Sequence, residues 1–303
     1  MTKTEISTGD AIRKAWKQGF VVPAFNIPYL PMMEPVVKAL KDTMCFGLIV
    51  VARLEWIKFQ SKSMKAIRDE YEKVKDIRYT RLHLDHVPVI DEDNLRTDFE
   101  RDIAEAITLG YESVMVDGSR LSLKENITQT LKITTMAHQA GIPVEAELGA
   151  VMGHEEGPMP PYDELFTSGK GFTSPDEAKR FVEETQTDWL SVAIGNIHGA
   201  ISASKKNIKK VEARLNIQHL DKINRMTQIP LVLHGGTGIR KPYIMDSFKH
   251  GIAKINIATA IRQPYETYMN TSVKEAQEAV YKAMTDLILN ELEINGTALK
   301  MIE

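Results

Sequence analysis

The sequence contains a single cysteine, Cys45, so no disulfide can form within the chain and no cysteine-rich zinc module is present. Its neighbours Met44 and Phe46 belong to no reactive-cysteine motif, which favours a structural role for the thiol. No stretch approaches the roughly 18 consecutive apolar residues of a membrane-spanning helix. The first residues also lack the apolar region of a signal peptide. We therefore expect a cytoplasmic protein with no membrane partner.

The chain also lacks a charge imbalance. Its formal net charge is −3 over 303 residues, and the charged side chains are interspersed rather than grouped in blocks of one sign. This balance gives no electrostatic reason to expect a nucleic-acid partner. With 43% hydrophobic residues, the composition is that of an ordinary globular protein, long enough to form one large core.

Short Val/Ile/Leu-rich runs alternate with amphipathic helical segments along most of the chain. This pattern predicts a parallel sheet covered by helices, and eight such units in succession fit an α/β fold of the (β/α)8 TIM-barrel type. The alternative is an open doubly wound sheet, but no Gly-x-Gly-x-x-Gly follows the first expected strand. We expect one domain, 1–303, whose tail at 264–303 forms two helices as a C-terminal helical extension. The expected strands are 20–27, 47–52, 79–85, 113–118, 143–149, 188–195, 229–234 and 253–257.

A histidine ends or closely follows three of the expected strands: His86, His198 and His234. In a barrel of this kind the carboxyl ends of the strands share one mouth, where active sites lie. Three imidazoles meeting there suit Zn²⁺, which takes three protein ligands in catalytic sites, although other divalent ions remain open. Asp85 precedes the first of these histidines, and His83 should face the same way as Asp85, which suggests a supporting role.

Glycine-rich turns follow two of these histidines. Gly199 comes directly after His198, and 235–238 reads Gly-Gly-Thr-Gly after His234. Glycines let backbone N–H groups approach an anion closely. In a TIM barrel, the loops after strands seven and eight often bind phosphate. Residues 256–259 follow strand eight and offer further N–H and hydroxyl donors.

Seven segments, taken in order, carry a resemblance to a known family: 22–26, 82–86, 113–119, 145–149, 193–199, 231–236 and 254–259. They are similar to motifs of the class II, zinc-dependent ketose-bisphosphate aldolases, which include the fructose- and tagatose-bisphosphate enzymes. The match extends from about residue 8 to 262. The resemblance implies a metal-dependent aldolase that reversibly cleaves a phosphorylated ketose to dihydroxyacetone phosphate and an aldehyde through a zinc-stabilised enediolate.

The resemblance also implies roles for individual residues. His86, His198 and His234 would bind zinc, and Glu147 would lie near the metal as a second or transient ligand. Asp85 would be the acid/base residue, and Glu155 would remove the ketose proton. A monovalent cation near the phosphate is common in the family, and a homodimer or homotetramer is expected. The substrate would contact Asn26, Arg53, Gly199, Gly235, Gly236, Thr237, Asn256, Ile257, Ala258 and Thr259.

The chain departs from the family pattern at several positions. Arg53 stands where the family commonly has a phosphate-binding serine, and Val87 and Met152 replace usual glycines. The segment 157–172 has no counterpart that we can place. Arg53 suits a clamp for a carboxylate or a second phosphate, or else a salt bridge at the barrel rim with Glu55 or another acid.

Three alternatives to the metal-dependent aldolase hypothesis follow. One is a related zinc-enediolate lyase or epimerase acting on a carboxylate-bearing sugar. Another is a non-catalytic accessory subunit of an aldolase complex. The third is a Schiff-base aldolase with Lys254 as the nucleophile, which borohydride trapping would detect.

Overall fold

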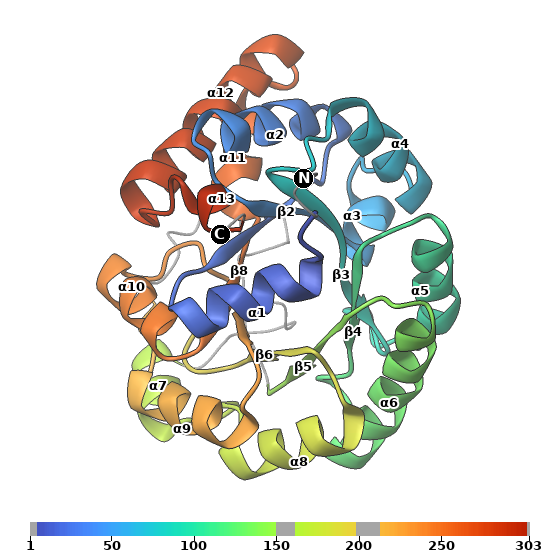
Figure 1. Cartoon of the computed structure of the whole chain (residues 1–303), viewed down its shortest axis with the longest axis vertical. Helices are drawn as coiled ribbons and strands as arrows, with labels where there is room; N and C mark the ends of the chain where they lie inside the picture. The colour runs from blue at the N-terminus through green and yellow to red at the C-terminus, as the bar shows by residue number, and fades with distance from the viewer. Residues whose placement is uncertain (1–4, 150–160, 198–212, 302–303) are drawn as a thin grey trace.

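The computed structural model describes residues 5–149, 161–197 and 213–301. In this part of the chain, eight parallel strands pair side by side in sequence order, and β8 pairs with β1 to close a barrel. Helices surround the barrel, as Figure 1 shows. The predicted (β/α)8 TIM barrel with C-terminal helices is confirmed, and the open doubly wound sheet is wrong. The strands are β1 Val22–Asn26, β2 Gly47–Ala52, β3 Thr80–Pro88, β4 Ser113–Asp117, β5 Val144–Leu148, β6 Trp189–Val192, β7 Leu231–Leu233 and β8 Ile252–Ile257.

The helices follow the strands around the barrel. Their N-terminal caps match the sequence signals at several places: Ser122 forms a capping box with Glu125, and Ser174 caps a helix that has Pro175 in its first turn. The helical elements are α1 Thr8–Gln18, η1 Leu30–Met32, α2 Met33–Asp42, α3 Arg53–Lys58, α4 Met64–Val74, α5 Phe99–Thr108, α6 Leu123–Gln139, α7 Tyr162–Ser168, α8 Pro175–Thr185, α9 Ile217–Thr227, α10 Lys241–Lys249, α11 Thr259–Tyr268, α12 Val273–Asp286, η2 Leu287–Glu291 and α13 Thr297–Lys300.

Several boundaries differ from the sequence expectations. The charged stretch 56–75, which has helical spacing throughout, is divided into α3 and α4, because Ser63 begins a new helix by accepting the Ala66 N–H. Residues 162–168, within the segment 157–172 that has no counterpart in the family pattern, form α7. The tail helices begin at Thr259 rather than at 264, and Pro264 lies inside α11. At this position, beyond the first turn, proline cannot donate the N–H that would otherwise bond to the Ala260 carbonyl.

One end of the barrel is closed by α1, which crosses the strands in Figure 1. Its apolar face, Ala11, Ile12 and Ala15, is fully buried in one cluster with barrel residues such as Val232 and Ala253. Helix α1 precedes β1, so it covers the amino ends of the strands. The opposite end, where the strands terminate in polar side chains, is left for chemistry.

The C-terminal helices pack outside the barrel, with α12 beside α2 (Figure 1). Gln277 donates a hydrogen bond to the Pro31 carbonyl at 2.9 Å, and the Tyr281 hydroxyl donates to Asp42 at 2.9 Å. Within the ranges described above, no helix has the length and apolar composition needed to cross a bilayer.

Cys45 is fully buried, and burial raises the pKa of its thiol to about 12. Because only the thiolate is a good nucleophile, Cys45 is inert at neutral pH. The structural role expected for this residue is confirmed.

Candidate active site

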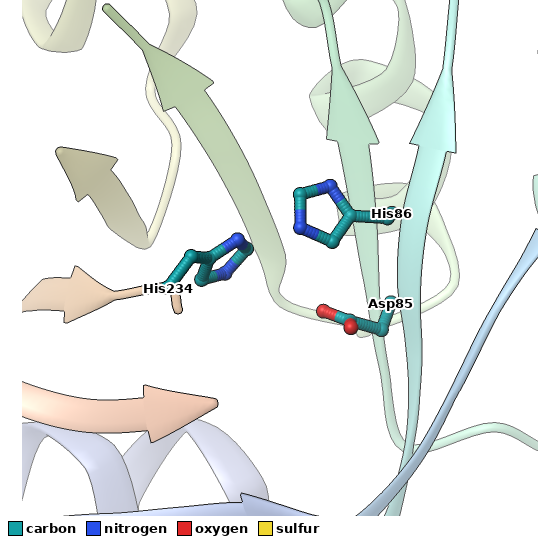
Figure 2. Close-up of side chains that lie close together, drawn as sticks. All are labelled: Asp85, His86 and His234. Carbon is teal, nitrogen blue, oxygen red and sulfur yellow. The ribbon is translucent and has the colours of Figure 1, made fainter. Parts of the chain in front are cut away.

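An irregularity in β3 places Asp85 and His86 together at the mouth of the barrel. Alternate residues of a regular strand face opposite sides, so two neighbours would normally point apart. Here the pairing of β3 with β4 shifts register between Leu84 and Val87, and His86 has a φ of +34°. This is the geometry of a β-bulge, which redirects a side chain. Figure 2 shows both side chains turned toward the space in front of His234.

Asp85 is buried and held by two asparagine side chains, one from β1 and one from β8. Asn26 at the end of β1 donates through Nδ2 to Asp85 Oδ2 at 3.1 Å, and Asn256 in β8 donates through Nδ2 to Oδ1 at 2.8 Å. Burial alone would raise the pKa of Asp85, but the charges of His86 and Lys254 outweigh it and lower the pKa to about 2. Asp85 is therefore an ionised carboxylate with both oxygens oriented.

His86 lies among three carboxylates. Its Nδ1 is 3.3 Å from Asp117 Oδ2 and 4.0 Å from Glu147 Oε2. Burial would lower its pKa, but the charge of Asp85 and the hydrogen bond with Asp117 raise it to about 10. The surroundings of His86 thus favour a positive charge at neutral pH.

His234 completes the group from the other side of the mouth. Its ring centre is 4.3 Å from that of His86. Glu145 in β5 accepts a hydrogen bond from Nε2 at 2.8 Å, which places Nδ1 3.2 Å from Glu147 Oε2. A carboxylate on the far nitrogen fixes the orientation of a metal-binding imidazole.

These side chains fit a divalent cation. In each of the sets Asp85–His86–His234 and His86–Asp117–Glu147, the potential ligand atoms lie within 4.8 Å of one another. Imidazole nitrogens and carboxylate oxygens are ligands that Zn²⁺ and similar ions accept. The carboxylates that stabilise a proton on His86 would stabilise a cation bound in its place.

A second layer of polar side chains lies directly below the first. Lys254 Nζ is 2.7 Å from Glu145 Oε2 and donates to Asn256 Oδ1 at 2.7 Å. The Trp189 indole donates to Glu145 at 2.6 Å. Lys254 Nζ is buried between these two partners, so attack on a carbonyl would require it to leave both, which does not favour the Schiff-base alternative.

The spacing of two residues along a strand explains this layer. Glu145 lies two before Glu147, and Lys254 two before Asn256, so each pair points to the barrel interior. From the sequence, we applied this spacing only to His83. That residue lies in the same layer, with Nε2 3.9 Å from Asp85 and Nδ1 2.8 Å from the Ser113 hydroxyl. The same spacing would have identified Glu145 and Lys254 as supporting residues.

Part of the expected phosphate site has other partners. The side chain of Asn256 is used on Asp85 and Lys254, and the Gly236 N–H donates to the Asn256 carbonyl at 3.2 Å. Gly236 is required for close packing, since a Cβ there would lie 2.8 Å from Ile255. The N-terminus of α11, with Ala258 as N-cap and Thr259 as first residue, faces the same end of the barrel. The first N–H groups of a helix have no partner inside the helix and attract anions.

Arg53 and Glu55 point in opposite directions from the start of α3. Arg53 Nε donates to Asp102 at 3.1 Å and Nη1 is 3.7 Å from Asp91 Oδ2, so the guanidinium forms a salt bridge at the rim. Its Nη2 has no hydrogen-bond partner in the described part of the chain. Glu55, which we considered as a partner for Arg53, is instead buried toward Asn26.

His198, Gly199 and Glu155 lie outside the described residues. Asp117, which ends β4, was assigned no role from the sequence. Its place 3.3 Å from His86 makes it part of the group.

Comparison with known proteins agrees with this geometry. The family model described as class-II fructose-bisphosphate aldolase matches residues 6–300. The chain is 33% identical to a fructose-bisphosphate aldolase of Helicobacter pylori strain J99, over 85% of this chain and 84% of that one. It is 31% identical to a probable fructose-bisphosphate aldolase of Bacillus subtilis strain 168, over 84% and 81%.

Solved structures resemble it over nearly their whole length. The YdjI aldolase of Escherichia coli K12 has a TM-score of 0.73 at 25% identity, covering 97% of this chain and 99% of that one. A putative fructose-1,6-biphosphate aldolase of Coccidioides immitis shares the fold, with a TM-score of 0.74 at 23% identity and coverage of 96% and 97%. The chain belongs to the class II fructose-bisphosphate aldolase family.

Proposed function

We propose that the enzyme reversibly cleaves a ketose 1,6-bisphosphate to dihydroxyacetone phosphate and an aldehyde, with Zn²⁺ as the resident ion. The observation that carries this proposal is an ionised acid, Asp85, whose oxygen lies within 4.8 Å of ring nitrogens of His86 and His234. Aldol cleavage needs a proton acceptor at the C4 hydroxyl and stabilisation of the negative charge that develops on the carbonyl oxygen two carbons away. This group offers both within the space of one small substrate.

The residues of the chain divide the work. Asp85 accepts the C4 hydroxyl proton during cleavage and returns it during condensation, while Asn26 and Asn256 keep its oxygens oriented. His86 and His234, with His198 by resemblance, would hold the cation, and Glu147 and Asp117 would support it. When bound, the cation supplies Lewis-acid stabilisation of the negative charge that develops on the ketose oxygens. Glu155, by resemblance, would move the ketose proton.

The phosphate would lie between the turn 235–237 and the start of α11, at Ile257, Ala258 and Thr259, with a monovalent cation beside it. Backbone N–H groups and the helix dipole favour a dianion there. We also propose a homodimer or homotetramer, as is expected for the family.

The decisive experiment is a cleavage assay over fructose 1,6-bisphosphate, tagatose 1,6-bisphosphate and phosphorylated sugar acids. We expect one of the ketose bisphosphates to be cleaved fastest, in a reaction that EDTA stops and added Zn²⁺ restores. Borohydride with substrate should leave no adduct on Lys254. Fully metal-loaded enzyme that cleaves neither bisphosphate would overturn the proposal, and preferred cleavage of a sugar acid would favour the carboxylate-specific alternative.

Arg53 gives a test of substrate choice. Its Nη2, which has no hydrogen-bond partner among the residues described, and its place beside the mouth support a contact with a substrate anion. Arg53→Ser should therefore change the relative rates across this panel. Asp102→Asn is the matched control, because it weakens the same salt bridge but keeps the guanidinium. If both variants lower the melting temperature and neither alters the ratio of rates, Arg53 is a rim salt bridge only.

A further inference from the structure

Glu55 is a buried acid that the mechanism above leaves without a role. It is the third residue of α3, and its residue exposure is only 6%. Its Oε2 accepts the backbone N–H of Ala52, the last residue of β2, at 2.8 Å. This bond turns the carboxyl back over the strand end, and Ala52 is the direct register neighbour of Asp85. The side chain thus points into the barrel mouth, away from the rim where Arg53 lies.

The Asn26 side chain also lies near the carboxyl of Glu55, where hydrogen bonding from the amide acts to lower the pKa of that carboxyl. The same amide donates to Asp85 Oδ2 at 3.1 Å. An amide nitrogen carries two hydrogens, so one Asn26 Nδ2 can serve both carboxyls at once. With Glu55 in place, rotating the Asn26 amide away from Asp85 would also take it away from the Glu55 carboxyl.

The charge state of Glu55 suits this arrangement. Burial, together with the nearby charge of Asp85, raises the pKa of Glu55 to about 8, although the bonds from Ala52 and Asn26 and the charge of His86 oppose the shift. A mostly neutral acid beside Asp85 avoids placing two negative charges on one amide. It also makes glutamine, which is neutral and has the same shape, the appropriate conservative substitute.

We propose that Glu55 is a positioning residue for the aldol reaction: it holds the Asn26 amide against Asp85 and so fixes the orientation of the Asp85 carboxylate. The inference rests on the proposed role of Asp85 as proton acceptor. Because the contacts invoked for Glu55 are with residues of this chain, part of the test can be made without measuring turnover.

The kinetic test compares Glu55→Ala with Glu55→Gln. Misplacing a proton acceptor lowers the rate of the chemical step, so Glu55→Ala should reduce kcat by about tenfold or more and change KM little. Glu55→Gln keeps an oxygen for the two N–H donors and should retain at least about a third of the wild-type kcat. Should Glu55→Ala fold poorly, Glu55→Asp, which withdraws the carboxyl by one methylene, should show the same selective loss of kcat.

Glu112→Ala is the matched control. Glu112 accepts the backbone N–H of Leu82 at 2.8 Å, so it makes the same kind of bond, but near the start of β3, away from the mouth. If Glu55 only stabilised the fold, both alanine variants would lower the melting temperature and leave kcat of the folded enzyme unchanged. That result would overturn the inference, as would equal impairment of Glu55→Ala and Glu55→Gln.

Two further measurements separate this inference from the proposed reaction. In a crystal structure of Glu55→Ala we expect the Asn26 amide to leave Asp85, and an unchanged contact near 3.1 Å would contradict the proposal whether or not the enzyme turns over any tested substrate. In a double-mutant cycle, Asn26→Ala should lower kcat by itself and make Glu55→Ala nearly silent. Additive losses would mean that Glu55 acts by another route.

Discussion

Replacing Asp85 by asparagine is expected to lower kcat by about 10²-fold or more, the usual contribution of a positioned acid/base group. The amide has nearly the same shape but cannot accept the C4 proton. It also disturbs the two hydrogen bonds from Asn26 and Asn256, one of which would face an NH₂ group instead of an oxygen. Steady-state cleavage of the preferred ketose bisphosphate measures the effect.

The metal content must be measured on the same preparation, because Asp85 lies close to His86. We expect the variant to bind as much metal as the wild type, so that the loss of kcat does not reflect a loss of metal. A kcat within about threefold of the wild type would remove Asp85 from the role of proton acceptor, since positioned acid/base groups contribute far more.

The second large effect is expected at His234. His234→Ala removes an imidazole whose Nε2 is fixed by Glu145 and whose Nδ1 lies 3.2 Å from Glu147. Because three protein ligands hold a catalytic zinc ion, losing one should release most of the metal and reduce activity to background. Elemental analysis after dialysis, paired with the cleavage assay, measures both losses.

His250→Ala is the control for a general effect of removing an imidazole. His250 lies at the end of α10, partly exposed, 3.3 Å from Asp221. It should keep full metal content and activity. If His234→Ala retains a full equivalent of metal after dialysis, His234 is not a ligand.

Much of the fold was predictable from periodicity. Strand-length Val/Ile/Leu runs separated by helical patterns specify a parallel barrel, and polar residues at strand ends then share a mouth whatever their distance in sequence. That is why Asp85 and His234, almost half the chain apart, could be grouped in advance. The two-residue period of a strand would also have predicted the second polar layer. Glu145 and Lys254 precede Glu147 and Asn256 by two residues, so they point to the same side of their strands.

The orientations of His86, Arg53 and Glu55 depend on local backbone geometry that the periodicity of the sequence does not specify. A strict strand pattern puts His86 on the outer side, and only the register shift beside β4 brings it to Asp85. The opposite directions of Arg53 and Glu55 follow from one hydrogen bond to Ala52 at the start of a short helix. A capping contact of this kind is visible in sequence only once the helix start is known.

The bulge at His86 has a consequence for how this barrel trades stability against function. A residue with a side chain costs roughly 1–2 kcal/mol in the left-handed region, and His86 has a φ of +34° without a glycine at that position. A flat strand would be the more stable choice, but it would point the imidazole toward the surrounding helices. Sequence changes that favour regular β3 pairing would therefore raise the stability of the fold but lower the catalytic activity. The backbone conformation of His86 thus lowers the stability of the barrel but places the imidazole beside Asp85.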